Sequence, residues 1–320
     1  LIAEDNGKLV GALPLRVSRD KIRGLPAQKL SFLSDSTWTT GDLAVPGDNP
    51  EVIRLFGDYL IKGRWDIIDL QNVAETPAIT ALAGIMEKKG IGFSSSDASI
   101  FPCVKTDMEW EDFLKNRSTR FKKASRNKIN KIKKAGSFEV RRYSSPEEVE
   151  WALKRAFEIG QKGWKHANIN NSISSTEENR LFYSTLAKSM SPLGGIDIWL
   201  LNFEGVDIAF EYHVRSNGNI VALTADFDES YRRLSPGSVI DFHIMREIFR
   251  SGDFLYNMGC GESFYKDSWT ENALKYKRVL FYRDSTYGKL LGFAEKKVAT
   301  GLKSLRDKLK KKPEPAASQP

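Results

Sequence analysis

The sequence contains an ordered series of local signals twice, and this repeat constrains the fold more than any other feature. The first series is a hairpin signal at Asn6-Gly7 and a turn at Pro46-Gly47, followed by a helical stretch and an apolar strand. The second is a hairpin signal at Glu204-Gly205 and a turn at Pro236-Gly237, again followed by a helical stretch and a strand. The hairpins are 198 residues apart and the turns 190. This near-constant spacing predicts a tandem duplication.

The second copy shows the fuller pattern. A strand at 138–143 precedes helices that begin near Ser145 and Thr176, where caps and early acidic residues mark the starts. Three strands then form a meander over 196–227, and a helix and another strand follow. This order predicts an α+β class. We expect two tandem domains, each a mostly antiparallel mixed sheet flanked by helices.

The domain boundaries follow from these patterns. We expect an N-terminal domain over 1–112, truncated at its start because the chain opens at Leu1 without a methionine. The other expected parts are a basic linker helix over 113–137, a C-terminal domain over 138–285, a basic amphipathic helix over 286–313 and a disordered tail over 314–320.

The net charge of +8 is concentrated in two segments of an otherwise acidic chain. Residues 115–142 contain twelve Lys or Arg and one acidic residue. This segment is either a solvated linker helix, or a helix on which Arg117, Arg120 and Arg126 bind a phosphorylated acceptor. The second basic segment, 289–313, carries apolar residues at helical intervals from Leu291 onward. We expect it to pack on the protein and to end in a frayed basic stretch, with contact to anionic lipid as the alternative.

Several classes of protein are excluded or disfavoured. No stretch approaches the ~18 apolar residues that span a bilayer. Cys103 and Cys260 are far apart and the three histidines are isolated, so we expect no metal site and a reducing compartment. No GxSxG motif supports a serine hydrolase. We therefore expect a cytoplasmic protein, or one held peripherally at the inner face of the membrane.

The segment 228–239, DESYRRLSPGSV, has the chemistry of an anion site. A strand ends, two arginines follow, and a small-residue turn opens a helix whose first N–H groups point outward at the positive end of the helix dipole. Gly237 allows a phosphate to approach the backbone, and Arg232 or Arg233 adds a charge-assisted bond. The alternative is an ordinary strand-to-helix turn capped by Ser235.

This segment resembles the pyrophosphate loop of the GNAT acyltransferase superfamily, (Gln/Arg)-x-x-Gly-x-(Gly/Ala). Arg232 and Gly237 match that pattern, whereas Ser235 replaces its first glycine. The SPG version resembles the CelD/BcsL branch and the related Fem-like proteins. Further resemblances to that branch are the sequences VGALPL at 10–15, WEDFL at 110–114, KKAGSFEV at 133–140, GW at 163–164, IAF at 208–210 and YKDSW at 265–269.

The resemblance implies that the C-terminal copy binds acetyl-CoA or another acyl-CoA as donor. It also implies a bulge within 222–227 that separates this strand from the next and exposes a backbone N–H to the thioester carbonyl. In the first copy the corresponding loop, VPGDNPE at 45–51, has two acids after the glycine and no arginine before it, so we expect a degenerate site there. The implied donor-binding residues are Phe227, Arg232, Arg233, Leu234, Ser235, Pro236, Gly237, Ser238 and Val239.

Acyl transfer to an amine needs a proton acceptor for the amine and a proton for the leaving thiolate. Strand alternation places Glu211 and His213 on one face of the second meander strand, where they are either base candidates or solvent-facing residues. Asp226 is a further candidate for the base. Tyr265 and Lys266, which match the YK of the resemblance, are candidates near the leaving thiolate. We expect Arg120, Arg126, Trp164 and His213 to bind the acceptor.

These inferences predict an acyl-CoA-dependent N-acyltransferase that acts by direct transfer. The expected acceptor is an amine-bearing small molecule or glycan precursor, such as an amino sugar in exopolysaccharide or envelope synthesis. One alternative is a Fem-type transferase that takes an aminoacyl group from tRNA, for which the basic helix would contact the phosphate backbone. The other is a non-catalytic binding module at a membrane. The sequence leaves the acceptor, the acyl length and the oligomeric state open.

Overall fold

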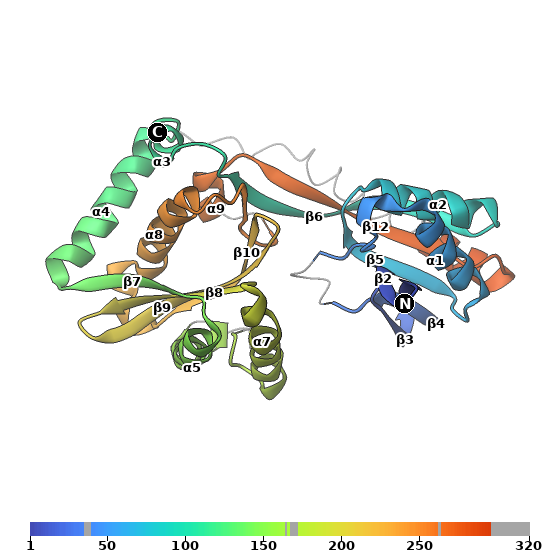
Figure 1. Ribbon diagram of the computed structural model, residues 1–320, viewed down its shortest axis with the longest axis horizontal. Coiled ribbons are helices and arrows are strands. Elements are labelled where there is room, and N and C mark those ends of the chain that lie inside the picture. The colour runs from blue at the N-terminus through green and yellow to red at the C-terminus, as the bar shows by residue number, and fades with distance from the viewer. Residues whose placement is uncertain (35–39, 164, 167–171, 262–263, 296–320) are drawn as a thin grey trace, which may run out of the picture. The chain divides into compact units, whose positions relative to one another are not determined.

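The structure, a computed structural model, describes residues 1–34, 40–163, 165–166, 172–261 and 264–295. The chain divides into two compact units (Figure 1). Unit 1 is formed by Leu1–Ser99 together with the chain from Lys275 on, and unit 2 by Ile100–Leu274. The chain enters unit 2 within β6 (Gly92–Lys105) and leaves it within β12 (Ala273–Tyr282).

Unit 1 begins with two hairpins. The first joins β1 (Ile2–Asp5) to β2 (Lys8–Ala12), and positive φ angles at Asn6 and Gly7 form the predicted turn. The second joins β3 (Leu15–Ile22) to β4 (Leu25–Phe32). β4 pairs in parallel with β5 (Ile67–Val73), and β5 pairs antiparallel with β12. β12 is thus a single strand that completes the sheet of unit 1.

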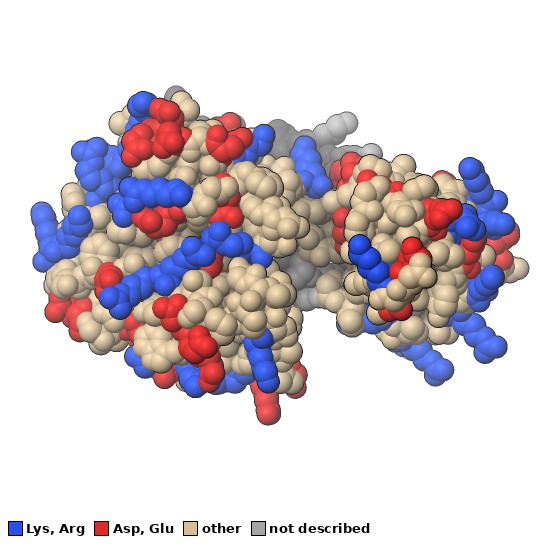
Figure 2. All heavy atoms as spheres, viewed as in Figure 1, with Lys and Arg blue, Asp and Glu red and all other residues tan. Residues whose placement is uncertain are grey.

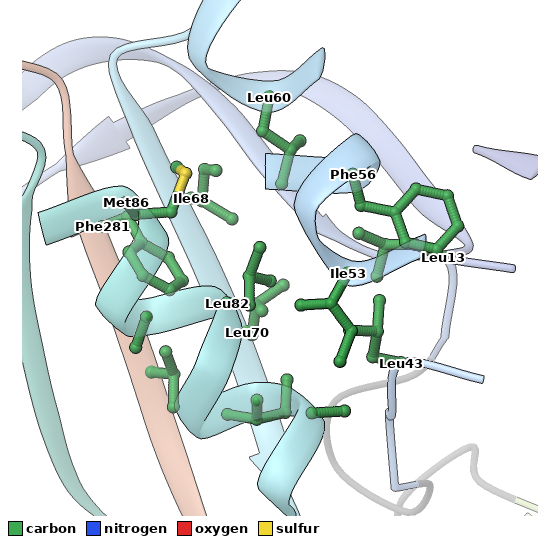
Figure 3. Packing of buried hydrophobic residues seen from close by; sticks show 14 of the residues in the cluster. Leu13, Leu43, Ile53, Phe56, Leu60, Ile68, Leu70, Leu82, Met86 and Phe281 are labelled. Carbon is green, nitrogen blue, oxygen red and sulfur yellow. The ribbon is translucent and has the colours of Figure 1, made fainter. Parts of the chain in front are cut away.

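Two amphipathic helices cover one face of this sheet. The 3-10 turn η1 (Pro46–Asp48) leads into α1 (Pro50–Lys62), and α2 (Pro77–Lys88) follows β5. Figure 3 shows Ile53 of α1 and Leu82 of α2 directed towards the strands that carry Leu70 and Phe281. On the opposite face, the helix at 286–295 buries Leu291 against Ile67. The predicted packing of this segment is thus confirmed up to residue 295, and residues 296–320, including the predicted tail, lie outside the described residues.

Unit 2 has the predicted order of strands and helices. After β7 (Phe138–Tyr143) come α5 (Pro146–Lys162), α7 (Glu177–Met190) and the 3-10 turn η2 (Ser191–Leu193). The meander β8 (Ile196–Phe203), β9 (Val206–Ser216) and β10 (Asn219–Phe227) follows. The last part consists of η3 (Glu229–Leu234), α8 (Pro236–Arg250), β11 (Leu255–Asn257) and α9 (Phe264–Trp269).

Helices cover both faces of the unit 2 sheet (Figure 1). The order of strands is β11-β10-β9-β8-β7, and the end of β6 pairs with β11. α5 and α7 pack on one face around Leu153 and Phe210. α8 packs on the other face, together with α3 (Trp110–Lys115) and α4 (Thr119–Ala135). The fold is therefore α+β, with a mixed sheet flanked by helices.

The basic segment differs from the predicted linker helix. Ser118 breaks it into α3 and α4, because its side chain accepts a hydrogen bond from the Phe121 amide and caps α4. Phe121 and Ile132 then bury one side of α4 in the core of unit 2. The segment predicted as a linker is thus part of unit 2, and residues 275–285, assigned to the C-terminal domain from sequence, belong to unit 1.

Candidate active site

Strands β10 and β11 separate in the middle of unit 2. They pair in parallel where Asn219–Val221 lies beside Leu255–Asn257, and β10 then continues to Phe227 paired with β9 but not with β11. The register between β10 and β9 shifts between Ala222 and Thr224. This irregularity confirms the predicted bulge, and the separation leaves backbone N–H groups of β10 without a partner strand on that side.

The N-terminus of α8 lies just beyond the end of β10. Ser235 occupies the left-handed region, with φ of 56°, and no side chain among the described residues caps the helix. By contrast, side chains cap α1, α2, α4, α5 and α7. A Cβ at Gly237 would meet nothing closer than 3.7 Å, so packing within the protein does not require a glycine there. The helix thus presents free N–H groups with room in front of them.

The predicted donor-binding residues divide into two groups around this terminus. Arg232 and Arg233 are exposed, and Gly237 and Ser238 are half-buried at the helix end. The remaining residues have structural contacts: Phe227 and Leu234 pack against the hydrophobic core, Pro236 and Val239 are buried, and Ser235 accepts a bond from the Val239 amide. The first group is the more accessible to a ligand through its side chains or first amides, and the bond to Ser235 uses only its backbone carbonyl.

A pocket of about 380 Å³ lies beside this terminus. It is bounded by α4, α8 and α9, and its walls include both basic and acidic side chains. The Lys128 Nζ of α4 donates to the Ser238 Oγ of α8 at 2.8 Å, which links α4 to the first turn of α8. The lining residues are Ser118, Arg120, Phe121, Ala124, Ser125, Lys128, Ser238, Asp241, Tyr265, Asp267, Ser268 and Trp269.

A buried polar cluster lies behind the pocket. Glu211 and His213 of β9 are 2 % and 0 % exposed, so the solvent-facing interpretation of both is wrong. The His213 Nε2 lies 2.8 Å from the Glu211 Oε2, and the Tyr256 hydroxyl of β11 donates to the same oxygen at 3.0 Å. The His213 Nδ1 has no hydrogen-bond partner among the described residues.

Asp241 connects this cluster to the pocket. It lies in α8, lines the pocket and hydrogen-bonds with Glu211, while the Tyr265 hydroxyl donates to its Oδ1 at 3.5 Å. Burial, together with the charge of Glu211, raises the pKa of Asp241 well above its ordinary value. Burial also opposes ionisation of Glu211, but hydrogen bonds from Asp241, His213 and Tyr256 outweigh it and lower the pKa of Glu211. The two carboxyl groups are thus driven to opposite protonation states.

Asp226, the third candidate for the base, is 7 % exposed at the end of β10. Its Oδ1 accepts from the Phe227 amide at 2.9 Å, and its Oδ2 has no partner among the described residues. Burial raises the pKa of Asp226. A Cβ at Gly163 would overlap its carboxylate, which explains why glycine stands at the end of α5. The Lys165 Nζ donates to the Ala225 carbonyl at 2.6 Å, and burial lowers its pKa.

The other predicted residues have mixed positions. Lys266 donates to the carbonyls of Gly259, Cys260 and Gly261 at 3.0, 2.9 and 3.2 Å, so its ammonium holds the loop after β11. Tyr265 lines the pocket. Of the predicted acceptor residues, Arg120 lines the pocket, Arg126 is exposed on α4, and His213 is buried behind it. Trp164 lies outside the described residues.

Sequence reasoning missed Asp241, Tyr256 and Lys128. Asp241 follows Gly237 by four residues and therefore shares its helix face, a spacing that could have indicated it. Tyr256 lies in a three-residue strand whose side-chain direction depends on pairing with β6 and β10. No local pattern gives that direction. Among the described residues, no group of three or more His, Cys, Asp or Glu is arranged to hold a metal ion.

The comparisons with known proteins agree with this geometry. Residues 119–267 match the acetyltransferase (GNAT) domain. The match extends from α4 into α9 and contains the bulge, the α8 terminus and most of the residues that line the pocket. Unit 2 therefore has a GNAT fold. No curated protein sequence matches the chain.

Solved structures are similar over most of the chain at low sequence identity. One is a conserved protein of unknown function from Bacteroides thetaiotaomicron, with 15% identity, 80% of this chain and 79% of that chain covered, and a TM-score of 0.55. L-PGS from Bacillus licheniformis shows 11% identity, 83% coverage of both chains and a TM-score of 0.55. FemX shows 12% identity, 88% and 87% coverage, and a TM-score of 0.53. These likenesses concern the fold and extend over both units.

Proposed function

We propose that the protein is an acyl-CoA-dependent N-acyltransferase that transfers an acetyl or longer acyl group directly to an amine. The observation that carries this proposal is the separation of β10 from β11 beside the uncapped start of α8, within a segment that matches a GNAT domain. GNAT domains bind acyl-CoA. The acceptor in this proposal is an amine-bearing small molecule or glycan precursor, such as an amino sugar used in polysaccharide or envelope synthesis.

The donor site in this proposal extends along the start of α8. The amides of Gly237 and Ser238 face the pyrophosphate, and the exposed Arg232 and Arg233 add positive charge. The rest of the donor follows the pocket between α8 and α9, which is about 380 Å³ in volume. A free backbone N–H of β10 near the bulge at Ala222 polarises the thioester carbonyl.

The chemistry requires a neutral amine and a protonated leaving thiol. Glu211 is too deeply buried to touch a substrate, so it acts through groups that reach the pocket. Tyr265 is the pocket residue to which we assign proton exchange with the substrates, and Lys266 fixes the neighbouring loop. Asp226 is a second candidate for the base, on the side of the sheet next to Lys165.

Calorimetry with acetyl-CoA and longer acyl-CoAs tests the proposal directly. We expect the wild-type protein to bind at least one of them, and Gly237→Glu to weaken binding about 100-fold because a carboxylate would face the phosphates. Gly84→Glu is the matched control, since a Cβ at Gly84 in α2 meets nothing within 4 Å. If the wild-type protein binds no acyl-CoA, the proposed function is wrong.

A second candidate is a Fem-type transferase that takes its aminoacyl group from tRNA. The observation that favours it is the basic surface of α4, where Arg120, Lys123 and Arg126 are exposed; Figure 2 shows Lys and Arg side chains along this edge of unit 2. It predicts tRNA binding that weakens steeply with salt, and a shallower salt dependence for the variant Lys123→Glu with Arg126→Glu. Lys8→Glu, on the β1–β2 hairpin, is the control. If the wild-type protein, the double variant and the control bind tRNA with equal affinity and equal salt dependence, this candidate function is wrong.

We place the protein in the cytoplasm, with peripheral membrane contact through residues 289–313 as a further proposal. Among the described residues, no helix has the length and apolarity needed to cross a membrane. Because Leu291 is buried, a truncation after Glu295 removes the basic end and keeps the packed helix. Flotation with anionic liposomes should depend on residues 296–313 if contact occurs, and a catalytically silent membrane module would float without binding any acyl-CoA.

A further inference from the structure

Two carboxyl groups meet at the inner wall of the pocket, where Glu211 is buried and Asp241 is half-buried and lines the pocket. The Glu211 Oε2 receives the hydroxyl of Tyr256 and the ring N–H of His213. The other oxygen, Oε1, has no N–H or O–H donor among the described residues as long as Asp241 is ionised. A buried carboxylate oxygen without a donor is costly, and two ionised carboxylates in contact repel each other. A single proton on Asp241 removes both penalties.

The hydrogen bonds around this proton all point in one direction. Tyr265, at the pocket, donates to the Asp241 Oδ1, and the proton of Asp241 is donated towards Glu211. Glu211 is the last acceptor in this series of hydrogen bonds, because Tyr256 and His213 also donate to it. The series therefore conducts a proton from the pocket inward to a buried carboxylate that is 2 % exposed.

We propose that Asp241 and Glu211 share one proton and, with Tyr265, form a relay that takes up the amine proton during acyl transfer and returns it to the leaving thiolate. This inference rests on the proposed function. The amine nitrogen forms a bond to the carbonyl carbon, and one proton of the amine passes to the Tyr265 oxygen. At the same time Tyr265 passes its own proton to Asp241, and Asp241 passes its proton to Glu211. The carbon–sulfur bond then breaks, and the same steps in reverse return the proton to sulfur. The products are an amide and a thiol, and the protein is restored.

In this scheme Tyr265 is the catalytic residue, and Asp241 and Glu211 act through it. His213 and Tyr256 are positioning residues that hold Glu211. The charged and titratable groups around the carboxyl pair come from several elements. They are Lys128 of α4, His213 of β9, Tyr256 of β11, Tyr265 of α9, and Lys165, which follows α5.

Carboxyl NMR of the wild-type protein with ¹³C-labelled Asp and Glu tests the shared proton without any substrate. We expect the Asp241 carboxyl to stay protonated to a higher pH than an ordinary aspartate, and the Glu211 carboxyl to respond in the pH range where Asp241 loses its proton. Asp241→Asn assigns the first signal and should remove the response of Glu211. The exposed Glu247→Gln, on the same helix, is the matched control. Independent titration of both groups in the acid range would overturn the proposal.

Kinetics then test the relay. The probe reaction is the release of free thiol from acetyl-CoA in the presence of glucosamine. We expect Asp241→Asn to lower kcat about 100-fold or more with little change in affinity for acetyl-CoA, because it interrupts proton transfer and keeps the size and shape of a side chain that lines the pocket. The fall of kcat towards acid pH that we expect for the wild-type protein should be absent from this variant. An Asp241→Asn enzyme as fast as wild type refutes the relay, whereas a wild-type protein that binds no acyl-CoA refutes the proposed function instead.

Discussion

The two helices at the repeated Pro-Gly pairs differ at their first turns: Pro46-Gly47 precedes α1, whereas Pro236-Gly237 begins α8. At α1 the Asn49 side chain accepts from the Glu51 amide, and Asp48 and Glu51 place negative charge at the positive end of the helix. At α8 the described residues supply no side-chain cap, no acid lies in the first turn, and two arginines precede it. α1 thus satisfies its own dipole, whereas the described residues give α8 no such charge or cap, and the proposed function assigns that role to the pyrophosphate of acyl-CoA. In this proposal a few side chains at the helix start determine whether it can bind a ligand.

The largest effect on acyl-CoA binding should come from placing an acidic residue in the first turn of α8, as in α1. Ser238→Asp should weaken acyl-CoA binding by about tenfold to 100-fold, because the carboxylate competes for the same amides and lies beside Lys128. The same change should stabilise the fold by about 0.3–1 kcal/mol. Calorimetry and urea unfolding measure the two effects. In the reciprocal variant, Glu51→Ser, we expect a small loss of stability and unchanged binding; weaker acyl-CoA binding there would contradict the comparison.

A smaller effect on binding is expected from a methyl group at the same terminus. Gly237→Ala should reduce acyl-CoA affinity about tenfold, since the added Cβ occupies the approach to the amides while 3.7 Å from Phe227. Stability should rise by about 0.4–1 kcal/mol, because alanine restricts the unfolded chain and the backbone at this position is helical. A destabilised Gly237→Ala protein would show that the glycine serves the fold rather than a ligand.

Substitutions at the residues that precede α1 and α8 should change the stability of the fold in opposite directions. Asn49→Ala removes a side chain that accepts a helix amide and should cost about 1 kcal/mol of stability. Ser235→Gly relieves a left-handed residue and should raise stability by up to about 1 kcal/mol. Urea midpoints of the two variants measure this difference. Losses of equal size in both would mean that Ser235 caps α8 after all.

The smallest expected effect is a pH dependence of stability. The pKa of Asp241 is raised in the folded protein by burial and by Glu211, so its contribution is present in acid and is lost as pH rises towards that folded pKa. Asn does not ionise, so the Asp241→Asn variant does not lose stability in this way as pH rises. The stability of the variant relative to wild type should therefore increase as pH rises from the acid range, and urea midpoints at several pH values measure it. A difference that does not vary with pH would contradict a protonated Asp241.

Local signals predicted most of the fold of unit 2, because turns, caps and apolar periodicity act over a few residues. The Glu204-Gly205 hairpin is an example, whereas the bulge after Ala222 was implied by the resemblance to the GNAT superfamily. The division of the chain into units 1 and 2 was not predictable from such local signals. β12 looks like part of the second copy in sequence, and only its pairing with β5 places it in unit 1.

The candidate site was predictable only in part, for the same reason. The α8 terminus lies in one short segment and could be recognised there. The environment of Glu211 depends on Tyr256 and Asp241, which come from other elements 45 and 30 residues away in the sequence. Alternation along β9 gives the face on which Glu211 lies, but the covering of that face by α8 decides whether the carboxylate meets water or a second carboxyl group.

The return of the chain into unit 1 has a consequence for biosynthesis. Val279 and Phe281 of β12 belong to the core beneath α1 and α2, and Leu291 covers the opposite face of the same sheet. On the ribosome, unit 2 has all of its residues before unit 1 receives this last strand. The first unit to be translated is therefore the last to be completed, and a nascent chain stopped short of residue 282 exposes the unfinished core to chaperones and proteases.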